Sequence, residues 1–269
     1  MPLSLPQCRV KWTVLPSRGE TVFYFGEKRR VDMRPIFIAL DFNNKEETMR
    51  FLGKFRGRDD LYVKVGMELF YMEGPAFVRE LRDAGYKIFL DLKLYDIPNT
   101  VEQAMKQLGQ LGVHYVTVHA SGGAEMLRAA RRGLEAGSSI SGLERPKLLA
   151  ITQLTSTNKE QMQKEQLVQA SLTKSVVHLA GLAFENGADG VISSAFENEL
   201  IHDETSESFL TINPGIRLQS DARDDQKRVV TPNKAAQMGS DGIVVGRSIT
   251  KAADPLKVYQ TIKTEWENR

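Results

Sequence analysis

Cysteine is almost absent from this sequence: Cys8 is the one cysteine among 269 residues. A single cysteine cannot form an intramolecular disulfide, and it cannot supply a cysteine-built zinc site. The sequence also lacks any run of the roughly 20 apolar residues that cross a bilayer. We therefore expect no disulfide scaffold and no membrane partner, and we place the protein in a reducing compartment, the cytoplasm.

Neither sign of charge dominates the chain. It carries 36 Lys and Arg residues against 34 Asp and Glu residues, a formal net charge of +2, and the two signs are mixed along the sequence. A nucleic-acid-binding domain shows a basic face or stripe, so we expect no nucleic-acid partner. Hydrophobic residues make up 41% of the chain, which is ordinary for a globular protein with a sizeable core.

The first 33 residues differ in composition from the rest. They contain three prolines and a basic run, but no sustained apolar period. A secretory signal needs a continuous apolar segment, and residues 3–14 are interrupted by Pro6, Arg9 and Lys11. We expect residues 1–33 to form an N-terminal extension that is poorly ordered or dispensable, with an organelle-targeting leader as the alternative. Residues 34–269 are expected to form a single domain.

From residue 36 onward, short apolar runs alternate with longer segments of helical period, which predicts repeated strand–helix units. Eight strands are predicted, at residues 36–41, 61–65, 87–92, 115–119, 147–152, 190–193, 209–212 and 242–245. Helices are predicted at residues 46–55, 75–84, 101–111, 124–135, 166–185, 234–238 and 255–266. Glycines suited to left-handed C-caps follow several of them, namely Gly85, Gly112, Gly137, Gly187 and Gly239.

The predicted strands are mostly apolar, as are the strands of a parallel sheet that is covered on both faces. No Gly-x-Gly-x-x-Gly motif follows the first strand, which ends instead at Asp41. A dinucleotide-binding open sheet therefore loses its main support. The predicted fold class is α/β: a single-domain (β/α)₈ barrel, or TIM barrel, which typically takes about 250 residues.

Polar residues recur at or just after the strand ends, whereas the strand interiors are apolar. They are Asp41, Lys64, Asp91, Lys93, His119, Thr155, Asn213 and Arg247. The C-terminal strand ends of a TIM barrel meet at one mouth, where the active sites of these enzymes lie, so we expect these side chains to converge there. We leave His119 out of the site, because a hydrogen-bonded core histidine is the commoner case.

Asp91 and Lys93 stand two residues apart, so an extended backbone would point both side chains to the same face. Each charge offsets part of the other's desolvation cost, and an isolated Asp-x-Lys is more often an ion pair than an active site. Here Lys64 ends the neighbouring strand and Asp96 follows in the next loop. Such alternating charges can act as acid and base, or can aim a field at a developing charge.

The segment from Asp91 to Pro98 reads Asp-x-Lys-x-x-Asp-Ile-Pro, and this signature resembles that of the orotidine 5′-phosphate decarboxylases. Six shorter segments support the resemblance by their order and spacing, at residues 38–41, 63–66, 118–120, 152–156, 214–217 and 244–248. The resemblance extends across residues 36–269. The resemblance implies a cofactor-free and metal-free enzyme that converts orotidine 5′-phosphate to uridine 5′-phosphate, the last step of de novo pyrimidine nucleotide synthesis.

The resemblance also implies roles for the charged residues. Lys93 resembles the general acid that protonates C6 of the pyrimidine as carbon dioxide leaves, and Asp91 would lie beside the departing carboxylate. Lys64 and Asp96 would complete the charged row. Asp41 and Lys64 resemble ligands of the ribose hydroxyls.

The resemblance implies further site residues, because members of the family form dimers in which each active site includes residues of both subunits. The resemblance implies a homodimer in which Asp96 to Thr100, including Ile97, reach into the neighbouring subunit's site. Thr155 would lie near the pyrimidine ring.

The loops after the seventh and eighth strands suit a phosphate, because barrel enzymes often bind phosphate there. Two arginines in these loops can hold a dianion. By resemblance the ligands of the 5′-phosphate and its surroundings are Pro214, Arg217, Gln226, Gly246 and Arg247. The polar stretch 217–228 would close over the phosphate; without the resemblance it reads as a solvated loop. Asn213 stands where many bacterial relatives have Thr, and we assign it no role.

Two other functions stay open. One is a sugar-phosphate decarboxylase or aldolase of the same barrel superfamily, some members of which use magnesium. The other is a phosphate-binding barrel without catalytic activity. Ile97-Pro98 and residues 152–156 favour the pyrimidine nucleotide, and the intact set of charged residues argues against a non-catalytic protein.

Overall fold

Eight parallel strands close into a barrel in sequence order, and β8 pairs with β1. The computed structural model describes residues 34–58, 60–219 and 229–268. The strands are β1 (Ile36–Ala39), β2 (Tyr62–Gly66), β3 (Lys87–Leu94), β4 (Tyr115–His119), β5 (Lys147–Ile151), β6 (Gly190–Ile192), β7 (Leu210–Asn213) and β8 (Gly242–Val245). Each lies within two residues of its predicted bounds, so the predicted single-domain TIM barrel is confirmed.

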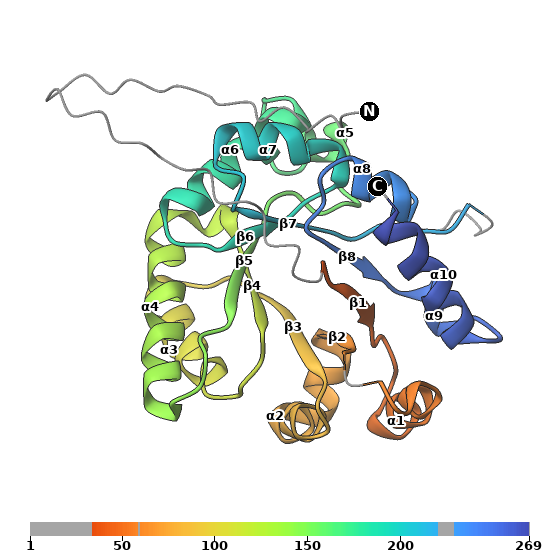
Figure 1. Ribbon diagram of the computed structural model, residues 1–269. Helices are drawn as coiled ribbons and strands as arrows, with labels where there is room; N and C mark the ends of the chain where they lie inside the picture. The colour runs from red at the N-terminus through yellow and green to blue at the C-terminus, as the bar shows by residue number, and fades with distance from the viewer. Residues whose placement is uncertain (1–33, 59, 220–228, 269) are drawn as a thin grey trace, which may run out of the picture. The chain divides into compact units, whose positions relative to one another are not determined.

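Helices surround the strands, as Figure 1 shows. The longer ones are α1 (Lys45–Leu52), α2 (Met67–Asp83), α3 (Pro98–Leu108), α4 (Gly123–Ser141), α6 (Leu172–Glu185) and α10 (Pro255–Glu267). The shorter ones are α5 (Lys159–Lys164), α7 (Asn198–Glu204), α8 (Pro232–Gln237), α9 (Arg247–Thr250), and the 3₁₀ turns η1 (Gly53–Phe55), η2 (Ala120–Gly122) and η3 (Ala195–Glu197). No helix of the described ranges is both long enough and apolar enough to cross a membrane.

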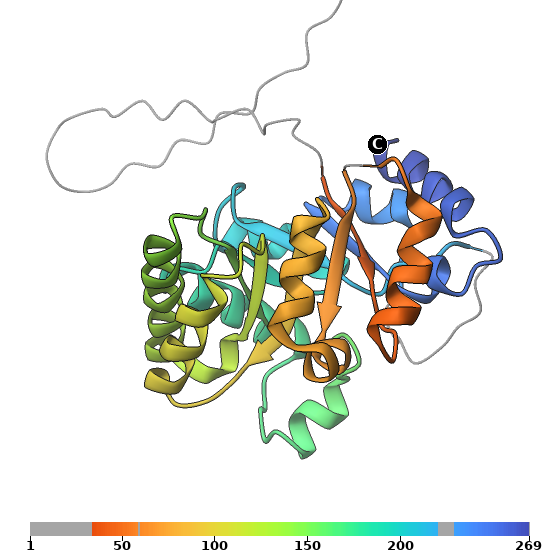
Figure 2. The same ribbon diagram turned by 90° about the horizontal axis from the view of Figure 1, so that it is seen from below.

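The predicted helix at residues 166–185 was wrong at its start. Residues 166–171 are not helical, and Leu167 adopts a left-handed conformation with φ 57°. The helix begins only after Ser171, whose side chain accepts a hydrogen bond from the N–H of Lys174. The separate helix α5 begins after Asn158 with a capping box, and Figure 2 shows it standing off from the ring of helices.

The prediction of left-handed glycines at helix ends held at three positions: Gly85, Gly187 and Gly239 have positive φ and directly follow the C-cap residues of α2, α6 and α8. Gly112 also has positive φ but lies beyond the C-cap of α3, and α4 runs on past Gly137 to end at a left-handed Gly142. A Cβ on Gly137 would lie 2.2 Å from the carbonyl oxygen of Lys106 in α3. Gly137 is therefore required by the close approach of two helix backbones and not by a helix end.

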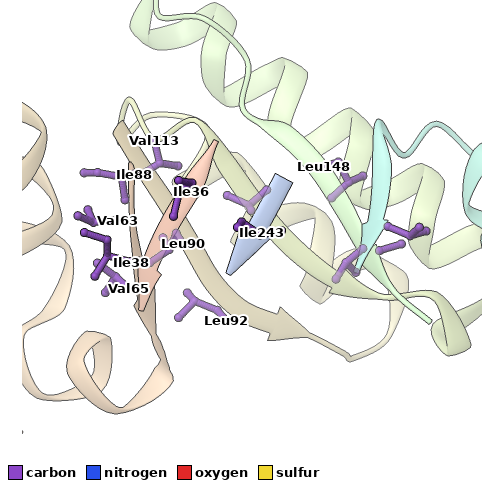
Figure 3. Close-up of a cluster of buried hydrophobic side chains, with 14 of the residues drawn as sticks. Ile36, Ile38, Val63, Val65, Ile88, Leu90, Leu92, Val113, Leu148 and Ile243 are labelled. Atoms are coloured by element: carbon purple, nitrogen blue, oxygen red, sulfur yellow. The ribbon is translucent and has the colours of Figure 1, made fainter. Parts of the chain in front are cut away.

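Alternate residues of each strand face two different cores. Ile36, Ile38 and Leu40 belong to the larger cluster, which they share with apolar side chains of the helices. Figure 3 shows part of this cluster, including Ile36 and Ile38. Phe37 and Ala39, between them in sequence, belong to a smaller cluster with residues of β3, β5, β7 and β8. The smaller cluster fills the inside of the barrel, and so fixes which residues of each strand point inward.

Candidate active site

An aromatic layer fills the barrel beneath the charged residues. The ring centroid of Phe37 lies 5.5 Å from that of Tyr62 and 5.1 Å from those of Phe89 and Tyr115. Two residues further along each strand come Ala39, Lys64, Asp91 and Thr117. Because alternate strand residues share a face, these side chains also point inward, one level nearer the mouth. The sequence thus places polar side chains on an apolar floor.

Two of these residues, Lys64 and Asp91, form a charge row together with Lys93 and Asp41. Lys93 Nζ lies 2.8 Å from Asp91 Oδ2, and Lys64 Nζ lies 3.6 Å from the same oxygen. On its other side Lys64 Nζ lies 3.3 Å from Asp41 Oδ1. The side chains of Asp91 and Lys64 are only 11% and 12% exposed, whereas Lys93 is 26% and Asp41 61% exposed. The centre of the row is therefore withdrawn from solvent, and both of its ends are more exposed.

Asp91 is held as an anion. Burial raises the pKa of its carboxyl, but the ammonium groups of Lys64 and Lys93 and hydrogen bonds from Lys93 and Thr117 outweigh burial and hold that pKa below its ordinary value. The buried hydroxyl of Thr117 donates to Asp91 Oδ1 over 3.1 Å. A carboxylate and two ammonium groups therefore meet at one inward-facing position.

The backbone at Lys93 differs from the expected extended strand. Lys93 has φ 52°, and the pairing of β3 with β4 shifts between Leu90 and Leu94. Leu90 pairs with Val116 and Leu94 with Val118, so the β3 side carries extra residues, as in a β-bulge. The meeting of Asp91 and Lys93 was predicted, but it is achieved through this bulge and not by plain alternation.

The segment that follows the row, from Asp96 to Thr100, is largely exposed. Asp96 is exposed, and its Oδ1 accepts a hydrogen bond from the N–H of Ile97 over 2.6 Å. Asp96 forms no ion pair with Lys64 or Lys93, both of which are described. Ile97 is 66% exposed, and Thr100, in the first turn of α3, is exposed as well. Within one chain, the predicted Asp96 to Thr100 segment thus stays outside the charge row.

Two glycines leave room around the row. A Cβ on Gly66 would lie 3.2 Å from Lys64 Nζ and 3.6 Å from Asp41 Oδ1. A Cβ on Gly246, after β8, would lie 3.7 Å from the Cβ of Ala39 and 3.9 Å from Asp41 Oδ2. Gly246 belongs to the predicted phosphate site, so the β8 loop and the charge row adjoin at Asp41.

The predicted phosphate loops lie at the ends of β7 and β8. Gly215 has φ 80°, and its carbonyl accepts a hydrogen bond from the N–H of Val230, whose own carbonyl accepts from Arg217. Arg217 Nη1 lies 3.4 Å from the hydroxyl of Ser248, and Arg247 opens α9. The loop after β7, which carries Arg217, therefore contacts the start of α9 after β8, which carries Arg247. Pro214 follows β7 directly, and Gln226 lies outside the described residues.

Asn213 has a structural environment that the sequence did not reveal. It is fully buried, and its side chain bonds Asn198 of α7 and Ser193 after β6 over 2.9–3.2 Å. Asn198 also donates to Ser240 over 3.0 Å. Asn213 therefore ties together the segments around β6, β7 and β8.

Two further predicted positions lie near the mouth. Thr155, in the loop after β5, is buried. His119 ends β4 with its ring edge-on to Tyr95, centroids 5.7 Å apart. Burial lowers the pKa of His119, and the charge of Lys93 lowers it further against the opposing effect of Asp91. A neutral His119 beside the row adds no positive charge to it.

The row suits proton transfer and charge stabilisation. Among the described residues, no three His, Cys, Asp or Glu side chains are grouped so that they could hold a metal ion. An ammonium can donate a proton and stabilise an adjacent anion, and its field is strongest where water is excluded. Thr117 and the bulge are the parts that sequence reasoning missed. A hydroxyl residue amid the apolar β4 was the available signal.

Comparison with known proteins identifies relatives of this arrangement. The family described as "Orotidine 5'-phosphate decarboxylase / HUMPS family" matches residues 34–262. Proteins named orotidine 5'-phosphate decarboxylase from Latilactobacillus sakei and Listeria innocua are 56% and 57% identical to the chain, covering 87% of it and 98% of each relative.

Solved structures agree. A crystal structure of orotidine 5'-phosphate decarboxylase from Lactobacillus acidophilus has a TM-score of 0.79 and 43% identity, covering 87% of this chain and all of the other. An uncharacterized conserved protein from Geobacillus kaustophilus has a TM-score of 0.77 and 48% identity, with the same coverage. The chain therefore belongs to the orotidine 5′-phosphate decarboxylase / HUMPS family.

Proposed function

We propose that this protein decarboxylates orotidine 5′-phosphate to uridine 5′-phosphate, the last step of de novo pyrimidine nucleotide synthesis. Family membership and the names of relatives more than half identical to it support the reaction. The observation that carries the proposal is the charge row, in which two ammonium groups meet the ionised Asp91 at the barrel mouth. We place the enzyme in the cytoplasm, as its cysteine content favours.

The chemistry explains why a row of charges is needed. Breaking the bond between C6 and the carboxylate leaves an electron pair on an sp² carbon, with no adjacent carbonyl to delocalise it. The ammonium of Lys93 stabilises that pair electrostatically and delivers its proton to C6, and the resulting amine regains a proton from solvent. Asp91, ionised beside the substrate carboxylate, repels it until carbon dioxide departs. No cofactor takes part in this mechanism.

The rest of the substrate is assigned to the surrounding residues. Asp41 and Lys64 bind the ribose hydroxyls, which suits their 3.3 Å pairing at the edge of the row. Thr155 faces the pyrimidine. The 5′-phosphate is bound by residues that follow β7 and β8 in the sequence, two of which are positively charged arginines. They are Pro214, Arg217, Gln226, Gly246 and Arg247. Binding energy from this remote anion can be used to close the site and lower the barrier.

We place the Asp96 to Thr100 segment in the active site of a second copy, within a homodimer. Two features support this. Asp96 is exposed and not paired with either lysine of its own row, and it is flanked by the exposed apolar side chains of Tyr95 and Ile97. Exposed apolar side chains beside a charged site are typical of interfaces. In the dimer Asp96 would be the fourth charged residue of the partner's row.

Substrate choice tests the proposal against a sugar-phosphate aldolase or decarboxylase of the same superfamily. Purified protein is mixed with orotidine 5′-phosphate, and separately with a ketose phosphate and borohydride. We expect the pyrimidine absorbance to change and no covalent adduct to form. Borohydride trapping of the ketose phosphate on a lysine, with orotidine 5′-phosphate untouched, would instead indicate a Schiff-base aldolase. Binding of orotidine 5′-phosphate without turnover would indicate a non-catalytic barrel.

A further inference from the structure

Thr117 lies in the middle of β4, is fully buried, and forms hydrogen bonds with two residues of the charge row, Asp91 and Lys93. Its Oγ1 accepts a hydrogen bond from the backbone N–H of Lys93 over 2.8 Å and donates to Asp91 Oδ1 over 3.1 Å. A hydroxyl has one proton, and an ionised carboxylate can only accept. The directions of both bonds are therefore fixed, with the proton on the Asp91 side and a lone pair towards Lys93.

The bond to Lys93 falls where the strand pairing is broken. In regular parallel pairing, backbone groups of β4 would satisfy the N–H groups of β3. Between Leu90 and Leu94 the register shifts, and Lys93 adopts the left-handed conformation that side chains other than glycine disfavour. The Thr117 hydroxyl supplies an acceptor for this part-buried N–H.

The bond to Asp91 orients the carboxylate. Asp91 Oδ2 faces Lys93 Nζ at 2.8 Å and Lys64 Nζ at 3.6 Å, while Oδ1 is taken by Thr117. Rotation of the carboxylate would exchange these partners. The Thr117 hydroxyl thus fixes the backbone conformation at Lys93. The same hydroxyl also fixes the orientation of the Asp91 carboxylate that the Lys93 ammonium faces.

We infer that Thr117 is a positioning residue for decarboxylation: its hydroxyl locks the bulge at Lys93 and the orientation of Asp91, so that ammonium and carboxylate are in place before substrate arrives. The inference rests on the proposed function, and it adds a residue that contacts the catalytic groups and not the substrate. Displacements of about 1 Å in such groups can cost on the order of 100-fold in rate.

Three variants separate the hydroxyl from the volume that it occupies. Thr117→Val keeps the shape and loses both hydrogen bonds, and Thr117→Ser keeps the hydroxyl. Thr211→Val is the matched control, because Thr211 is an equally buried strand threonine that also bonds a carboxylate, Asp241, but at the opposite end of the barrel. If Thr117→Val does not fold, Thr117→Ala replaces it.

The experiment measures kcat and KM for orotidine 5′-phosphate. We expect Thr117→Val to lower kcat by about 100-fold with little change in KM, and Thr117→Ser to restore most of it. Thr211→Val should keep kcat within about twofold, because it is distant from the row. A Thr117→Val enzyme with wild-type kcat, an equally impaired Thr117→Ser enzyme, or an equal loss in Thr211→Val would each overturn the inference.

A second readout needs no substrate. The carboxyl of Asp91 is titrated by carbon-13 NMR, with its signal assigned from Asp91→Asn. Since the Thr117 hydrogen bond lowers the pKa of Asp91, that pKa should be higher in Thr117→Val than in wild type and unchanged in Thr117→Ser. An unchanged pKa in Thr117→Val overturns the inference. If wild type does not turn over orotidine 5′-phosphate, the proposed function fails, and this titration alone decides whether Thr117 holds the row.

Discussion

Asp91 and Asp189 are two carboxylates at opposite ends of the barrel, each beside two cations, with side chains that are 11% and 15% exposed. Asp91 is near the C-terminal end of β3, and Asp189 directly precedes β6. Asp189 accepts a bidentate pair of hydrogen bonds from Arg145 at 2.7 and 2.8 Å and a third from the N–H of Leu148 at 2.7 Å. Arg131 Nη1 lies 3.6 Å away. Both carboxylates therefore have an ion-pair environment.

Their pKa values shift in the same direction for similar reasons. Burial raises the pKa of Asp189, but hydrogen bonds from Arg145 and Leu148 and the charges of Arg145 and Lys147 outweigh it and lower that pKa. The pKa of Asp91 is lowered in the same way by two lysines and Thr117. A perturbed carboxylate alone therefore does not distinguish an active site from a structural ion pair.

The two carboxylates differ in the cations that face them, arginine at Asp189 and lysine at Asp91. The Arg145 guanidinium occupies both oxygens of Asp189 and does not give up a proton in proteins. The ammonium of Lys93 occupies one oxygen of Asp91, is partly exposed at the mouth, and can give up a proton. Two carboxylates with little side-chain exposure thus form a structural ion pair at the base of the barrel and a reactive row at its mouth.

The largest effect is expected from Lys93→Ala. It should lower turnover by at least about 10³-fold, since general-acid catalysis and charge stabilisation are both lost. The free energy of unfolding should change little, because Lys64 still faces Asp91. Lys87→Ala, at the exposed other end of β3, is the control and should retain full activity. Steady-state kinetics and urea unfolding measure both quantities, and near wild-type activity of Lys93→Ala would contradict the proposed mechanism.

Asp189→Asn should show the reverse. Removing one partner of this part-buried ion pair leaves Arg145 uncompensated, and we expect about 2–3 kcal/mol less free energy of unfolding. Turnover below the unfolding temperature should stay unchanged, because Asp189 is at the far end of the barrel from the mouth. Urea unfolding at pH 7 together with an activity assay tests this. Lost turnover in a folded Asp189→Asn protein would erase the distinction between the two carboxylates.

Acid should weaken both regions. The folded-state pKa of each carboxylate is lower than in the unfolded chain, so its contribution to stability is fully present above the unfolded pKa of about 3.9 and is lost as pH falls through the folded value. The free energy of unfolding should therefore decline below about pH 4. Urea unfolding across that range should show a shallower decline in Asp189→Asn. If the free energy of unfolding fell equally steeply with pH in wild type and in Asp189→Asn, Asp189 would not contribute to the acid sensitivity.

The smallest effect concerns His114, another side chain at the base. Its Nδ1 accepts a hydrogen bond from the N–H of Ile88 over 3.1 Å, and burial, helped by the charge of Lys87 and opposed by Glu144, lowers its pKa. The neutral ring's contribution is complete above the unfolded pKa of about 6.5 and is lost as pH falls through the folded value.

His114→Asn retains an acceptor at the position of Nδ1 but does not titrate. When the pH falls through the folded pKa of His114, the wild type should lose less than about 1 kcal/mol of unfolding free energy. The variant should not show this His114-dependent loss. Urea unfolding between pH 7 and pH 5 measures the difference. A variant with the same pH dependence as wild type would exclude His114 as its source.

The barrel was predictable because its signals are local and periodic. Eight apolar runs and their flanking polar residues give both the strands and the mouth, and the meeting of Asp41, Lys64, Asp91 and Lys93 follows from strand order. Predictions failed where tertiary contacts decide. The helix expected from residue 166 starts later, at a Ser171 cap.

The features that the sequence did not reveal share one cause. A threonine such as Thr117 is common in strands, so its sequence does not reveal that the hydroxyl faces a bulge. Lys93 adopts a left-handed φ although it is not a glycine, so the sequence does not indicate that conformation. Gly137 has the sequence pattern of a helix cap, and only the structure shows that the backbone of α3 lies against it. Each depends on a residue that is distant in the sequence, which single-chain patterns do not contain.

The central claim is that the charge row alone, without metal or cofactor, decarboxylates orotidine 5′-phosphate. The most direct measurement follows the pyrimidine absorbance of orotidine 5′-phosphate mixed with exhaustively chelated protein in heavy water. We predict full turnover and one deuterium at C6 of the uridine 5′-phosphate formed. No consumption of substrate, or turnover that returns only when a divalent metal is added, would contradict the claim.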